Sequence, residues 1–220
     1  MRRDLKKLFS TEDLEAIRKA TSEAEGQSSG EIVPVVVSSC SDTGEAAWKL
    51  VAFGALALPL LAALAYSRFE LWGEHITWWM LGPPVIGGAF GWLLGWICPS
   101  CRRLLMDRED LERAVAARAR QAFLEEEVFA TRERTGILIF LALFERRVVV
   151  MGDEGINRAI RQEEWQGIVD DLIEGIRSGR PAEALIRAIG ECGKILETHG
   201  VEIRPDDTNE LADGLRMEDH

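Results

Sequence analysis

The sequence predicts an α/β protein with a small mixed sheet in an α/β/α sandwich, interrupted by a two-helix transmembrane hairpin. Three short, apolar, β-branched segments alternate with amphipathic helical patterns, which is typical of a sheet covered by helices. Between about Trp48 and Cys98 the chain is almost free of charged side chains, whereas both flanks are rich in Glu, Asp and Arg. The expected order is helix, strand, two spanning helices, helix, β-hairpin and two helices.

Composition narrows the classes of protein that fit. A formal net charge of −11 argues against a general nucleic-acid binder, because phosphate contacts require a basic surface. The four cysteines do not follow a disulfide-framework pattern. The basic start lacks an apolar run and a small-residue cleavage site, so we expect no secretory signal peptide.

The apolar stretch, residues 47–98, divides into two candidate spans. The first runs over about 48–66, roughly 28 Å of helix and close to the thickness of a bilayer's hydrocarbon core. The second runs over about 76–98. All tryptophans except Trp165 lie in or beside this stretch, as the bilayer interface favours. We therefore expect the lipid bilayer to be a partner of this chain.

Small and helix-breaking residues mark both spans. Pro59 predicts a kink in the first span. Gly87, Gly91 and Gly95 recur every four residues, which gives a smooth face for close helix packing. That face could pack against the chain's own first span or against another copy.

The short flanks predict the orientation of the hairpin. Lys49 precedes the first span and Arg102 and Arg103 follow the second, while the connecting loop holds only Arg68 against two glutamates. Positive residues stay on the cytoplasmic side. The sequence therefore predicts a two-span protein of the cytoplasmic (inner) membrane whose soluble segments are cytoplasmic.

The remaining residues predict one domain split by the hairpin. Its N-terminal part, residues 1–46, holds a helix that starts at a capping box and then a buried strand in which Pro34 requires a strand start or an unpaired edge position. Its C-terminal part, residues 99–205, holds the other elements, and residues 206–220 form an acidic tail expected to be loose. The expected elements are helix 11–25, strand 31–38, helix 104–131, strands 136–143 and 147–151, and helices near 165–176 and 181–200.

Four short segments resemble the TPM-domain family in their order and spacing. They are Ser29-Gly30-Glu31-Ile32-Val33, Thr135-Gly136-Ile137-Leu138, Glu145-Arg146-Arg147-Val148 and Gly152-Asp153-Glu154-Gly155-Ile156. TPM domains are small α/β/α sandwiches, and the family includes a thylakoid-lumen phosphatase-like protein of photosystem II repair and an acetylcholine-receptor accessory protein. The resemblance is to a bacterial, membrane-associated branch. It implies service to a membrane complex, and the family's phosphatase and divalent-metal associations imply the same for this chain.

Acidic residues after two strands are candidate metal ligands. Asp42 follows the first strand, and Asp153 and Asn157 follow the third. Carboxylate and amide oxygens are ligands that Ca²⁺ or Mg²⁺ prefers, and metal-binding relatives point the same way. The alternative is structural: Asp42 caps a helix, Asp153 belongs to a turn and Asn157 is a surface residue.

Cys98-Pro-Ser-Cys101 is a single C-x-x-C pair at the predicted cytoplasmic interface. Such a pair can be redox-active, supply half of a zinc site, or carry acyl chains. It can equally be two ordinary interfacial thiols.

The sequence favours a non-catalytic accessory or assembly factor for a membrane complex, with a membrane protein partner. The alternative is a metal-dependent phosphatase of the TPM type. A phosphatase needs a nucleophile or a metal-activated water, and neither a Cys-x₅-Arg pattern nor an Asp-x-Asp pair occurs.

Overall fold

The computed structural model describes residues 5–41, 44–69, 76–199 and 210–218. These residues divide into two compact units. The hairpin unit lies within residues 41–111, and the sheet unit is made of residues 2–40 and 112–220.

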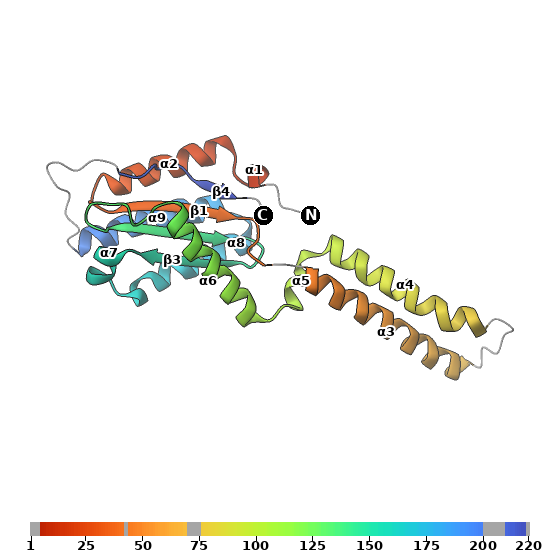
Figure 1. The fold of residues 1–220 in the computed structure, drawn as a ribbon. Coiled ribbons are helices and arrows are strands. Elements are labelled where there is room, and N and C mark those ends of the chain that lie inside the picture. Colours follow the sequence, from red (N-terminus) through yellow and green to blue (C-terminus); the bar gives the residue numbers. More distant parts are fainter. Residues whose placement is uncertain (1–4, 42–43, 70–75, 200–209, 219–220) are drawn as a thin grey trace. The chain divides into compact units, whose positions relative to one another are not determined.

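A four-stranded mixed sheet is the centre of the sheet unit, as Figure 1 shows. Its strands are β1 (Glu31–Val37), β2 (Gly136–Ala142), β3 (Arg147–Gly152) and β4 (Arg216–Glu218), in the order β3-β2-β1-β4. β1 is parallel to both β2 and β4, whereas β2 and β3 are antiparallel. The predicted mixed sheet is confirmed.

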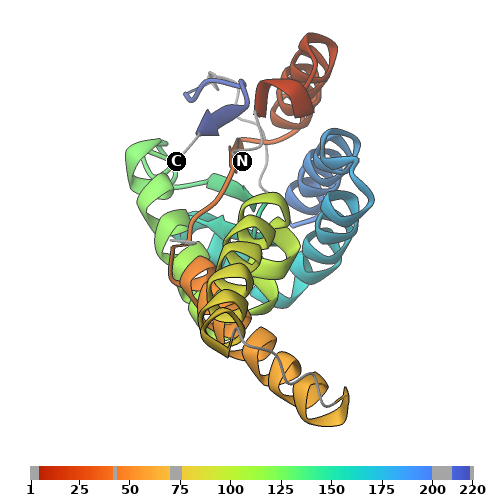
Figure 2. The same ribbon diagram turned by 90° about the vertical axis from the view of Figure 1, so that its right-hand side faces the viewer.

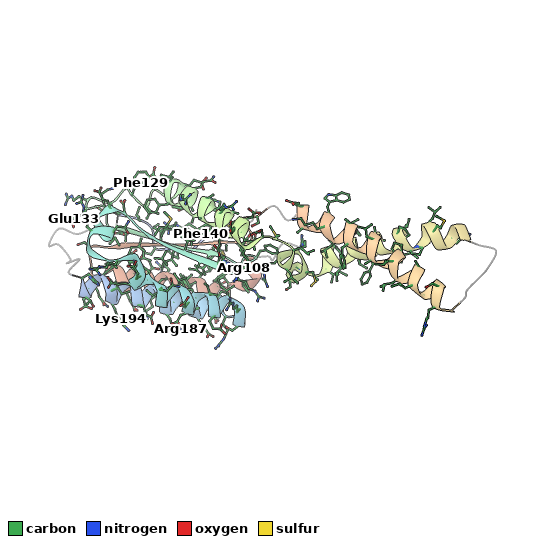
Figure 3. All side chains as sticks on the ribbon, turned by 90° about the horizontal axis from the view of Figure 1, so that it is seen from below. Arg108, Phe129, Glu133, Phe140, Arg187 and Lys194 are labelled. Carbon is green, nitrogen blue, oxygen red and sulfur yellow. The ribbon has the colours of Figure 1, made fainter. Side chains whose placement is uncertain are left out.

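Helices cover both faces of this sheet (Figure 2). One face packs on α6, where Val33, Val35 and Phe140 meet Val115 and Ala119. The other face packs on α2, α8 and α9 around buried Ile and Leu side chains. Figure 3 shows Phe140 inside the first layer and Arg187 and Lys194 on the outer side of α9. The predicted α/β/α sandwich is confirmed. The helices are α1 (Leu5–Leu8), α2 (Thr11–Glu25), α6 (Arg108–Glu125), α7 (Glu154–Ala159), the 3₁₀ turn η1 (Gln162–Trp165), α8 (Gln166–Ser178) and α9 (Pro181–Thr198).

Local sequence signals set several boundaries as predicted. Ser10 and Asp13 form a reciprocal capping box at the start of α2. Gly179 ends α8 in the left-handed conformation, with φ 77°. Pro34 lies inside β1, and its nitrogen faces the edge that β4 covers only from Val35 onward. No neighbouring strand therefore needs an N–H from Pro34.

Two expectations were wrong. The helix expected over 104–131 is shorter, because α6 covers only Arg108–Glu125. Leu104 ends a separate short helix, α5 (Pro99–Leu104), and Asp107 caps the start of α6 by accepting the Glu109 N–H at 2.9 Å. The acidic tail 206–220 is not loose throughout, because Arg216–Glu218 forms β4 on the edge of β1. A three-residue strand is too short for its periodicity to be recognised.

The hairpin unit consists of α3 (Gly44–Phe69) and α4 (Ile76–Ile97), which pack closely along their length, followed by α5. Gly87 and Gly91 lie so near α3 that a Cβ on either would collide with the carbonyl oxygens of Gly54 and Leu50, respectively. A Cβ on Gly95 would lie tightly against the side chain of Leu50, 3.2 Å from its Cδ1 atom. The glycine face therefore packs against the chain's own first apolar helix.

The outer surfaces of α3 and α4 are apolar and exposed, and Figure 3 shows their side chains projecting outward. Trp48 and Leu56 are each 74 % exposed, and Trp78 is 76 % exposed. Both helices are long and apolar enough to cross a membrane, over Gly44–Ala65 and Met80–Ile97.

Candidate functional site

Polar side chains gather at the two opposite ends of the sheet. The motif end lies where β1 and β2 begin and β3 finishes, since Glu31 is in register with Gly136 and Ile137 with Gly152. The turn end lies where β1 and β2 finish and β3 begins, since Val37 is in register with Ala142 and Ala142 with Arg147.

The motif end brings together three of the four segments that resemble TPM domains. The Thr135 hydroxyl donates to the Ser29 carbonyl at 2.7 Å, and the Glu31 N–H donates to the Thr135 carbonyl at 3.2 Å. Gly136 passes so close to the Val128 carbonyl that a Cβ would collide with it. These residue types fasten the start of β2 to the start of β1.

Glu25 closes the open edge of β1 at the motif end. Its Oε1 accepts the Ile32 N–H at 2.8 Å, at a position on β1 that β4 does not reach because β4 pairs only from Val35 onward. Burial, assisted by the neighbouring Glu31 carboxylate, raises the pKa of Glu25 to about 8. At neutral pH this carboxyl group is therefore largely protonated.

Asp153 and Asn157, the candidate ligands after β3, lie together on one turn at the motif end. Asp153 is 7 % exposed, and its Oδ2 pairs with Arg134 Nε at 2.9 Å. The Asn157 side-chain amide donates to the Gly152 carbonyl at 2.6 Å. Both side chains thus make structural contacts at the start of α7, which is the alternative role considered for them.

Asp42, the third candidate ligand, lies outside the described residues. Its neighbour Cys40 is held at the turn end, where the Cys40 N–H donates to Glu145 Oε1 at 2.9 Å. A strand of seven residues such as β1 spans about 20 Å, so this end is remote from Asp153. The structure therefore brings Asp153 and Asn157 together, but it holds Cys40, two residues before Asp42, at the opposite end of the sheet.

At the turn end, Glu145 is a buried carboxylate, 4 % exposed, between β2 and β3. Its Oε1 accepts from the Ser39 hydroxyl at 3.1 Å as well as from Cys40. Burial and the Glu145 carboxylate raise the pKa of the Cys40 thiol to about 12. Cys40 is therefore a protonated thiol at neutral pH and a poor nucleophile.

Two cations at the turn end, Arg118 and Arg147, are paired with carboxylates. Arg118 of α6 pairs with Glu125 at 2.9 Å and also with Glu218 at the end of β4. Arg147 pairs with Glu112 at 2.7 Å.

In open α/β sheets, ligands bind beyond the carboxyl ends of the strands where the strand order switches, which here is between β1 and β4. Arg118 and Glu218 occupy that position and bind one another.

The hairpin unit holds the predicted thiol pair. Cys98 and Cys101 are both free and half-buried, with their Sγ atoms 3.0 Å apart. Across residues 5–41, 44–69, 76–199 and 210–218, no group of three or more His, Cys, Asp or Glu is arranged to hold a metal ion.

Glu25, Arg134 and Glu145 were not among the predicted site residues. Glu145 could have been suspected, because a carboxylate between two apolar strands needs partners when the turn is buried. Glu25 is the last residue of a helix, where glutamate is common, so nothing in the sequence indicates that it binds the backbone of β1.

Comparisons with known proteins agree with this geometry. A family model described as the TPM domain matches residues 105–195, so the chain carries a TPM domain, as its resemblance to that family implied. The NMR structure of the BA42 protein from the psychrophilic bacterium Bizionia argentinensis is similar, with a TM-score of 0.58, 18 % identity, and coverage of 96 % of this chain and 95 % of that one. At that identity the likeness extends to the fold alone. No curated protein sequence matches the chain.

Proposed function

We propose that this chain is an integral protein of the cytoplasmic (inner) membrane, in which α3 and α4 cross the bilayer. Its TPM domain would then serve a membrane complex as a non-catalytic accessory or assembly factor. The exposed apolar surface of the α3–α4 hairpin is the observation that carries this proposal.

The dimensions and burial of the hairpin support membrane insertion. At 1.5 Å per residue, the 26 residues of α3 and the 22 of α4 give about 39 Å and 33 Å of helix, against a hydrocarbon core of about 30 Å. The core helices of a soluble protein would be mostly buried. Here the two candidate spans are 6 % and 17 % buried.

Membrane extraction tests the first half of the proposal. After alkaline carbonate washing, we expect the full chain to stay in the membrane pellet and to be released only by detergent. Release by carbonate alone would contradict membrane spanning.

Cysteine labelling tests the orientation. Ser67 is exposed near the end of α3, so a Ser67→Cys variant lacking the native cysteines should react with an impermeant maleimide in intact cells. The matched control returns Cys101 alone, which should react only after the membrane is opened. The reverse pattern would overturn the cytoplasmic placement.

Ion pairing within the domain supports an accessory role. Three described cations close to strand ends, Arg118, Arg134 and Arg147, are paired with carboxylates of the same unit. Recognition of phosphate by any of them would first have to break such a pair. A membrane protein partner suits a domain whose two halves are joined through the hairpin.

Copurification in mild detergent tests the accessory role. The tagged full chain should bring a membrane protein complex with it, whereas a tagged chain of residues 41–111 should not, because it lacks the TPM domain. Recovery of the same proteins with the hairpin alone would assign the interaction to the hairpin instead.

The alternative function is a metal-dependent phosphatase that uses Ca²⁺ or Mg²⁺. The observation that favours it is that Asp153 and Asn157 lie together on one turn at the motif end. If the purified protein hydrolyses a generic phosphomonoester with either ion, Asp153→Ala should abolish turnover and exposed Asp171→Ala should not. No turnover, and no thermal shift with either metal, would remove this alternative.

A further inference from the structure

In the hairpin unit, the thiols of Cys98 and Cys101 are two reactive side chains that lie in contact with one another. The two residues bracket the turn by which the chain leaves α4 and enters α5. Their Sγ atoms are 3.0 Å apart, inside hydrogen-bonding range for sulfur, and the Cys101 N–H donates to the Cys98 carbonyl at 3.1 Å. The backbone itself thus holds the two sulfurs side by side.

We propose that Cys98 and Cys101 are a reversible dithiol–disulfide site that is oxidised by small-molecule disulfides such as oxidised glutathione. The inference is independent of any accessory or phosphatase function. It assigns to the hairpin unit a chemistry that the TPM domain does not require.

Geometry and access distinguish this pair from the other two cysteines. Cys192 is fully buried in the core, and Cys40 is held beside a buried carboxylate. Burial raises the pKa of both thiols to about 12, which makes them inert at neutral pH. Cys98 and Cys101 are half-buried, so a small disulfide can reach them.

The hydrogen bond between the two sulfurs gives the two thiols different roles in disulfide exchange. The Cys101 thiol donates to Cys98, which lowers the pKa of Cys98 and raises that of Cys101. Cys98 is therefore the attacking thiol and Cys101 the resolving one. This division is the usual arrangement in a C-x-x-C pair that exchanges disulfides.

The exchange balances in two steps. The Cys98 thiolate attacks one sulfur of the small disulfide, whose S–S bond breaks and releases one thiolate that takes up a proton. Cys101 then loses its proton and attacks Cys98 Sγ, forming the intramolecular S–S bond and expelling the second small thiol. The pair has lost two electrons and two protons, and the small disulfide has been reduced to two thiols.

A zinc half-site is the competing use of the same thiols. A closed structural zinc site needs four ligands, usually Cys or His, and the described residues place no further ligand group beside this pair. Zinc would therefore require ligands from another chain. The intramolecular bond needs only the two sulfurs already in contact.

Redox titration of the full chain in mild detergent tests the proposal. The protein is equilibrated in mixtures of reduced and oxidised glutathione, its thiols are alkylated, and intact mass and peptide mass are measured. We expect a monomeric oxidised form that is lighter by two hydrogen atoms, with one S–S bond joining Cys98 to Cys101. A variant with Cys40→Ser and Cys192→Ser should titrate identically.

Single variants test the two roles. Cys101→Ser should accumulate a mixed disulfide of Cys98 with glutathione, several-fold faster than Cys98→Ser accumulates one at Cys101. A pair that stays alkylatable at every glutathione ratio would overturn the proposal. Disulfides formed only between chains, or stoichiometric zinc that copurifies and blocks alkylation, would overturn it as well.

Discussion

Two carboxylates hold the two ends of β1. Glu25 accepts the N–H of Ile32 near the start of the strand, and Glu145 accepts the N–H of Cys40 just beyond its end. Both side chains thus satisfy main-chain donors that no neighbouring strand reaches. An unsatisfied buried donor costs about 1–3 kcal/mol, so each carboxyl group should matter to stability.

Glu25 should make the stability of the sheet unit depend on pH. Its folded pKa of about 8 lies above the usual pKa of a glutamate, 4.5, so its contribution to stability is fully present below pH 4.5 and is lost as pH rises through 8. We expect the free energy of unfolding to fall by about 2 kcal/mol between pH 5 and pH 9, reduced from the full linkage value by partial solvation of the group. Thermal unfolding followed by circular dichroism in detergent would measure this.

The matched comparison for Glu25 uses two glutamine variants. Glu25→Gln keeps an acceptor oxygen for Ile32 but cannot ionise, so it should flatten the pH profile and gain stability at pH 9. Glu23→Gln, on the exposed side of α2, should leave the profile unchanged. Equal destabilisation by Glu25→Gln at pH 5 and pH 9 would contradict the titration argument.

Glu145→Ala should destabilise the sheet unit by about 2–3 kcal/mol, because it leaves two donors at Ser39 and Cys40 without their acceptor. Glu145→Gln keeps one acceptor oxygen and should cost less than half as much. Denaturant unfolding at pH 7 would compare the variants. If Glu145→Ala lowered the free energy of unfolding no more than Glu145→Gln, the carboxylate would not be the group that holds Ser39 and Cys40 in place.

Residue contacts were predictable from the sequence only where they are local. The bond between Ser10 and Asp13 joins positions three apart and follows from a known capping pattern. The bond between Cys40 and Glu145 joins positions 105 apart, and only the fold makes them neighbours. For the same reason, the sequence could propose Asp42 and Asp153 as one site without knowing that the antiparallel β3 ends at the opposite edge from β1.

Among the elements, β1, β2 and β3 were predictable because buried strands read as unbroken apolar runs. The helices α2, α8 and α9 were predictable from their caps and periodicity. β4 was not, because its few residues are polar and are fixed by pairing with β1. Strands of this kind depend on their partner and leave little trace in the sequence.

The α3–α4 packing predicts a strong dependence on side-chain size along the glycine face. Gly87→Leu should force the helices apart and lower the midpoint of thermal unfolding in detergent, at a cost of about 1–3 kcal/mol. Gly82→Ala, in the same helix but with open space around it, is the matched control and should be nearly neutral. Equal tolerance of both substitutions would show that the two helices do not pack as the structure describes.

For the whole molecule, we expect the sheet unit to fold without the hairpin. Glu112 pairs with Arg147 at the turn end, where Cys40 also lies, so the gap left by removing residues 42–106 is short. A Gly/Ser linker of about 12 residues, with a reach of about 20 Å, should bridge it. The product should be monodisperse without detergent and should unfold cooperatively; aggregation in every buffer would contradict an independent unit.

The position of the hairpin between β1 and β2 has a consequence for biosynthesis. β1 leaves the ribosome about 100 residues before the strand that completes its ladder, and elongation at 5–20 residues per second leaves it unpaired for about 5–20 s. If α3 and α4 cross the bilayer as proposed, the translocation machinery receives them during that interval. We therefore expect nascent β1, with seven residues that are buried after folding and four of them valine, to bind chaperones until β2 arrives. Ribosome-bound chains stalled before residue 136 should be protease-sensitive at β1.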